Sequence, residues 1–82
     1  FSRLVAADSL NAEAMTMATR IAAGPNFAHM MTKTQLQHEW NMTLDQAIEA
    51  EAQAQAICMQ TQDFQRAYDA FVAKQRAEFV GD

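Results

Sequence analysis

The sequence predicts an all-α fold, a small bundle of about four helices. Two glycines and one proline among 82 residues leave few turns, which disfavours a sheet. Apolar residues recur at steps of three and four in the first and last predicted helices, and capping residues stand before most of the predicted starts. Eighty-two residues allow one domain at most, so residues 1–82 are treated as a single domain.

The first predicted helix covers residues 9–23. Its apolar stripe has steps of four, three and four residues: Leu10, Ala14, Met17 and Ile21. Asp8 or Ser9 is expected to cap the start of this helix with a side-chain oxygen. Gly24 is expected to adopt the left-handed conformation at its end, and Pro25 cannot continue the helix.

The second and third predicted helices cover residues 26–40 and 44–60. The second has a weaker apolar pattern, since Thr34, Gln35 and His38 interrupt its apolar side. Thr43 and Gln46 form a capping-box pattern at the start of the third. Alternating alanines between positions 50 and 56 resemble a strand, but the strong helix propensity of alanine, glutamate and glutamine favours a helix.

The fourth predicted helix covers residues 62–75, with Thr61 as its cap and Asp63 near the positive end of its dipole. It has the best amphipathic stripe in the chain: Phe64, Ala67, Tyr68, Phe71 and Val72. Phe64, Tyr68 and Phe71 are therefore candidates for docking onto another surface. The alternating charges of Asp63, Arg66 and Asp69 predict side chains exposed to solvent.

Composition limits the classes of function. Six basic against ten acidic residues give a net charge of −4, which argues against a nucleic-acid binder. No apolar run is long enough for a membrane span, and the N-terminus does not resemble a signal peptide. A single cysteine, Cys58, excludes an internal disulfide and fits the reducing cytoplasm.

The chain is not expected to bury a large core of its own. Much of its apolar half is alanine, which buries little area per residue. We therefore expect the apolar faces to lie on something beyond this chain. The sequence also lacks an initiator methionine, and we expect it to be a piece of a longer protein.

The sequence offers no catalytic residue and no metal site. His29 and His38 are nine residues apart and have no ligand at i+4. Glu49 and Glu51 project in different directions from one helix, and Glu39 lies outside any acid–base grouping that the sequence suggests. Without a glycine-rich loop, there is no phosphate cradle and little material for an oxyanion hole. Cys58 is expected to be a small buried thiol rather than a nucleophile.

Lys74 and Arg76 follow Phe71 in an otherwise acidic chain. Positive charge beside an aromatic ring can hold a phosphate group and stack a base. The same residue types also complement the negative end of a helix dipole, and the sequence alone favours that simpler interpretation.

Several segments occur in the same order as similar segments in a known protein family. They are Ile21-Ala-Ala-Gly-Pro25, Thr32-Lys33, Leu44-Asp-Gln-Ala-Ile-Glu-Ala-Glu51, Gln60-Thr-Gln-Asp-Phe64 and Ala70-Phe-Val-Ala-Lys-Gln-Arg-Ala-Glu-Phe79. The chain resembles the C-terminal helical region of enoyl-CoA hydratases and isomerases, the crotonase superfamily. The resemblance covers essentially all 82 residues.

The resemblance implies a helical trimerisation region that follows a larger catalytic α/β core, which is absent from this sequence. Family members form trimers or dimers of trimers and act on coenzyme A thioesters without a further cofactor. Phe71 matches an aromatic residue that lies against the adenine end of coenzyme A, and Lys74 matches a lysine that contacts its phosphates. The catalytic glutamates and the donors to the thioester oxygen lie upstream, so this chain alone is expected to be inactive.

Two departures from the family pattern leave the branch open. Gln65-Arg-Ala67 stands where the family often has glutamate-glycine, and Ala73 and Gln75 stand where it often has glutamate and arginine. Hydratase, isomerase and aromatic-degradation branches all fit. A free-standing helical interaction module with no enzymatic role is the alternative from a different class of function.

Overall fold

The computed structural model describes residues 3–82, and this part of the chain is helical without any strand. Its elements are η1 (Ala7–Ser9), α1 (Leu10–Ala22), α2 (Asn26–His38), η2 (Glu39–Asn41), α3 (Leu44–Cys58) and α4 (Gln62–Val72), where η marks a 3₁₀ helix. The predicted all-α fold with four helices is confirmed. Each α-helix ends one to three residues before its predicted end. Within the described residues, no helix is long and apolar enough to cross a membrane.

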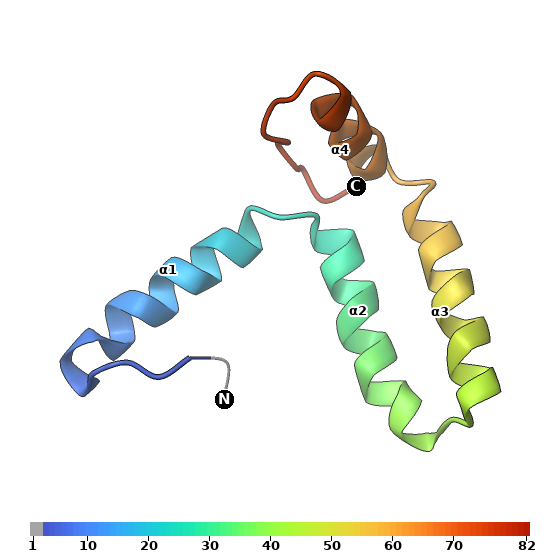
Figure 1. Ribbon diagram of the computed structural model, residues 1–82, viewed down its shortest axis with the longest axis horizontal. Helices are drawn as coiled ribbons and strands as arrows, with labels where there is room; N and C mark the ends of the chain where they lie inside the picture. The colour runs from blue at the N-terminus through green and yellow to red at the C-terminus, as the bar shows by residue number, and fades with distance from the viewer. Residues whose placement is uncertain (1–2) are drawn as a thin grey trace.

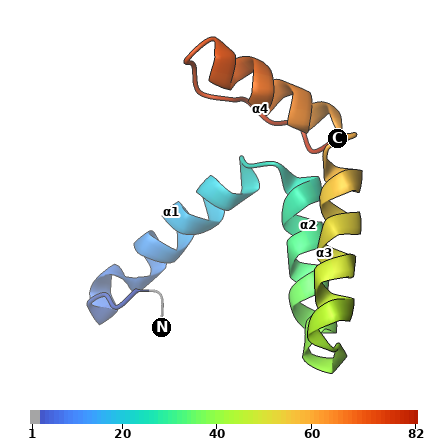
Figure 2. The same cartoon turned by 45° about the vertical axis from the view of Figure 1, so that its right-hand side comes forward.

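The helices form an open arrangement (Figures 1 and 2). Helices α2 and α3 lie side by side as a hairpin, whereas α1 extends away from them. The chain after α4 turns and runs back along that helix, so the C-terminus lies near its start. The radius of gyration is 15.9 Å, against about 12 Å for a compact domain of this length.

Very little apolar surface is buried. Ala54, at 7 % exposure, is the one buried apolar residue among residues 3–82. The accessible surface is 7083 Å², roughly 2,200 Å² more than a compact protein of this mass exposes. Much of this excess is apolar side-chain surface, including Leu4, Trp40 and Phe71. This means that side-chain burial within this chain does little to hold the helices together.

The start of α3 follows the predicted capping box. The Gln46 amide N–H donates to Thr43 Oγ1 at 3.2 Å, and the Thr43 N–H donates to Gln46 Oε1 at 3.0 Å. Two backbone donors that the first turn would leave free are thus paired. The alanine-rich segment is helical, as its propensity predicts.

The predictions for the two ends of α1 are wrong. No side chain caps its start, because the chain enters through the 3₁₀ turn η1 and Ser9 already has a helical backbone. Gly24 does not adopt a left-handed conformation. A Cβ atom at this position would lie 2.5 Å from Nε2 of His29, so the imidazole ring would have to move to make room for it.

Candidate functional site

The end of α4 brings together the two residues that the resemblance assigns to coenzyme A. The Lys74 N–H donates to the Phe71 carbonyl at 3.1 Å, and the Gln75 N–H donates to the Ala70 carbonyl at 2.8 Å. These two bonds form a Schellman motif, in which Lys74 takes the position where the backbone turns left-handed. Its φ of 56° is the one positive φ of a non-glycine residue between positions 3 and 82.

The left-handed position of Lys74 has an energetic cost. A residue with a Cβ pays about 1–2 kcal/mol in this conformation, and glycine is the usual choice. The last turn of α4 contains no basic residue, and Ala73 is the C-cap, so neither Lys74 nor Arg76 is part of the helix itself. Both lie beyond the helix end instead.

The apolar stripe of α4 is largely uncovered. Phe64 is partly covered, because it lines a small cavity of about 160 Å³ together with Pro25, Ala28 and Phe79. Tyr68 is more than half exposed, and Phe71 is 82 % exposed. Phe71 is thus available to another surface or to a ligand, and the described part of the chain does not use it as core.

The prediction that Asp63 is a solvent-exposed charge is wrong. Asp63 is only 2 % exposed, because the C-terminal segment closes over it. The Val80 N–H donates to its Oδ1 at 2.9 Å and the Gly81 N–H donates to its Oδ2 at 2.7 Å. Arg66 donates to the Asp63 carboxylate at 2.7 Å and also pairs with Asp82.

A further bond strengthens this attachment, since the Asp63 N–H donates to the Asp82 carbonyl at 2.8 Å. We call these contacts of Asp63 and Arg66 with residues 80–82 the C-terminal clasp. They hold the segment after Lys74 against the first turn of α4. Gly81 suits the clasp, because its φ of 94° is costly for any residue with a Cβ.

The clasp changes the acidity of Asp63. Desolvation acts to raise the pKa of this carboxyl. The N–H groups of Val80 and Gly81 and the guanidinium of Arg66 stabilise the carboxylate more strongly, so the net pKa is lowered. The pKa of Arg66 is raised, first by its hydrogen bonds to Asp82 and Asp63. The clasp is therefore charged throughout the physiological pH range.

A second carboxyl grouping lies between η2 and α3. The pKa of Glu39 is raised by hydrogen bonding to the Glu51 carboxyl, then by desolvation and by the charge of Glu51. One oxygen of the Glu39 carboxylate is buried without a hydrogen-bond partner, as is the nearby amide nitrogen of Gln35. The interpretation of Glu39 as isolated is therefore wrong, since the hairpin of α2 and α3 brings Glu51 to it.

The remaining candidate residues form no further grouping in the described part. No three histidine, cysteine, aspartate or glutamate side chains lie together as metal ligands between residues 3 and 82. Cys58 is half-buried rather than buried, at the end of α3. The candidate groupings described so far are thus the clasp, the end of α4 and the Glu39–Glu51 pair.

The sequence model of the family described as enoyl-CoA hydratase/isomerase matches residues 1–82, the whole of the sequence. No individual curated protein matched the chain. The match over the full sequence shows that this helical chain belongs to the enoyl-CoA hydratase/isomerase family.

Proposed function

We propose that this chain is the C-terminal helical part of an enoyl-CoA hydratase, a cytoplasmic enzyme of fatty-acid or aromatic-acid catabolism. The parent enzyme reversibly adds water to a 2-enoyl-CoA to give a 3-hydroxyacyl-CoA. The family match over residues 1–82 is the observation that carries the proposal. The open arrangement of the helices supports it, because such a chain needs a larger body to cover its apolar faces.

In this proposal, Phe71 and Lys74 form one wall of the coenzyme A site. Phe71 offers an exposed ring to the adenine, and Lys74 offers an ammonium group to the phosphates. Both are exposed and lie at the same end of α4, three residues apart across the Schellman motif. The chemistry takes place on residues of the upstream core, so this chain contributes binding and no catalytic group.

The exposed stripe of Phe64, Tyr68 and Phe71 supplies contacts to the catalytic core or to neighbouring subunits of a trimer or a dimer of trimers. Large apolar side chains on α1 and at the turn between α2 and α3 are also exposed, among them Met15, Trp40 and Leu44. Their burial in the assembly would stabilise it by roughly 25 cal/mol for each Å² of apolar surface removed from water.

Hydration of crotonyl-CoA by the full-length protein tests the proposal. The proposed hydratase consumes the 2-enoyl thioester, whereas an isomerase would convert a 3-enoyl-CoA and leave crotonyl-CoA unhydrated. The isolated 82-residue chain is the control and should show no hydration. Hydration by the isolated chain, or failure of the full-length protein to turn over either substrate, would count against the proposal.

The role of Lys74 has a separate kinetic test. Lys74→Ala in the full-length enzyme should raise KM for the CoA ester more than it lowers kcat, because the ammonium group binds far from the reacting carbons. Lys33→Ala, on α2, is the matched control for loss of an exposed lysine. A large loss of kcat with unchanged KM would contradict this role.

A further inference from the structure

Three basic side chains from separate elements surround one region between α1 and the C-terminal segment. Arg20 lies in the last turn of α1, His29 in the first turn of α2, and Arg76 just after the Schellman motif. Arg20 and Arg76 both line an open hollow of about 690 Å³ and an adjoining one of about 450 Å³, and His29 lines the smaller hollow. We call these three residues the basic cluster.

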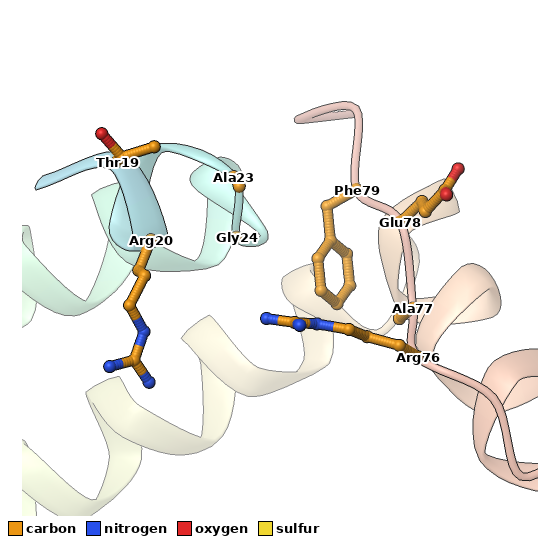
Figure 3. A pocket seen from close by; sticks show the side chains of 8 residues that line it. All are labelled: Thr19, Arg20, Ala23, Gly24, Arg76, Ala77, Glu78 and Phe79. Carbon is orange, nitrogen blue, oxygen red and sulfur yellow. The ribbon is translucent and has the colours of Figure 1, made fainter. Parts of the chain in front are cut away.

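The two arginines have no acidic partner among residues 3–82. The described ion pairs involve Arg3 and Arg66 instead. Glu78 is the one acidic residue that lines either hollow, and Figure 3 shows its carboxylate pointing away from the space between Arg20 and Arg76. In a chain of net charge −4, this region therefore has a local excess of positive charge.

Backbone features bring the cluster together. His29 lies against Gly24 so closely that any side chain there would displace the ring. Arg76 is carried by the segment between the Schellman motif and the C-terminal clasp, which is fixed at both ends by hydrogen bonds. The segment is thus already ordered before a ligand binds, so binding loses less conformational entropy.

We propose that the basic cluster binds the phosphate group of a small molecule. Guanidinium groups present paired N–H donors that match phosphate oxygens. Two guanidinium groups and an imidazole together match the charge of a phosphate dianion better than the charge of a single carboxylate ligand. The Phe79 ring lies beside the Arg76 side chain at the same hollow (Figure 3) and offers an apolar face to the organic part of the ligand. Phe71 and Lys74 line neither hollow, so the site is separate from the proposed coenzyme A wall.

Calorimetric titration of the full-length protein with inorganic phosphate and with phenyl phosphate tests this site. Both probes should bind saturably, and phenyl phosphate should bind more tightly because its ring can lie on Phe79. Arg20→Gln and Arg76→Gln should each weaken binding roughly tenfold, while Lys33→Gln should leave it unchanged. Circular dichroism of each variant should match that of the unsubstituted protein, which separates lost binding from lost folding.

Each outcome has a definite meaning. Equal affinity for the two probes would support a site for the free anion rather than for a phosphomonoester. Absence of phosphate binding in the full-length protein would overturn the proposal. So would equal weakening by Lys33→Gln and Arg76→Gln, because binding would then follow total charge alone. The readout needs no enzymatic activity, so its failure is distinct from failure of the proposed hydratase function.

Discussion

Replacing Lys74 with glycine should stabilise the end of α4 while it removes the ammonium group. Lys74 has a φ of 56°, where a residue with a Cβ loses about 1–2 kcal/mol. Glycine avoids this cost but loses roughly 0.5–1 kcal/mol through its greater freedom in the unfolded chain. Both hydrogen bonds of the Schellman motif are made by backbone atoms and remain. The free energy of unfolding should therefore rise by roughly 0.5–1 kcal/mol.

Urea denaturation of the full-length protein measures this change, with Lys74→Ala as the matched control. Alanine keeps the Cβ and its strain, so its free energy of unfolding should stay within roughly 0.5 kcal/mol of that of the unsubstituted protein. Both variants lose the ammonium group and should raise KM for crotonyl-CoA equally. If the glycine variant is no more stable than the alanine variant, the conclusion that the left-handed backbone of Lys74 is strained would be refuted.

Three further predictions concern the clasp, the carboxyl pair and the capping box. Asp63→Asn should speed amide exchange at Val80 and Gly81 roughly tenfold, because a neutral amide accepts more weakly than a carboxylate. In the unsubstituted protein, the pKa of Asp63 is lowered from its ordinary value of 3.8, so the clasp should be fully formed above pH 3.8. It should be lost only as the pH falls through the lower pKa of the folded state. Amide exchange at Val80 and Gly81, measured at a series of pH values, would show this loss. Glu39→Gln should raise the stability of the protein at pH 7 and make it less dependent on pH. The pKa of Glu39 is raised from its ordinary value of 4.5, so the stability that this carboxyl contributes below pH 4.5 is lost as the pH rises through the pKa of the folded state. Thermal melts at pH 4 and pH 7 would show the difference. Thr43→Ala should lower the free energy of unfolding by about 1 kcal/mol, and Thr43→Ser should restore it in the same urea assay.

Features that depend on neighbours within four residues could be predicted from the sequence. The capping box of Thr43 and Gln46, the Thr61 cap and the four helices rest on such local contacts. The apolar stripe of α4 follows from the helical period in the same way. Family membership could also be inferred, because it rests on the order and spacing of residues along the whole chain.

Features whose partners lie far apart in the sequence required the tertiary structure. Asp63 meets Val80 and Gly81, which are 17 and 18 residues away, and no local pattern distinguishes it from an ordinary charge in a first helical turn. The same holds for Glu39 and Glu51, whose proximity follows from the hairpin of α2 and α3.

The positions of the helices and the family of this protein could be inferred from the order of its residues, because helix formation depends on short-range propensity and capping. Which charges are buried and which basic residues converge follows from the folded structure. Charge burial depends on how the chain folds back on itself. At the C-terminus, a few long-range hydrogen bonds rather than a packed apolar core hold that path.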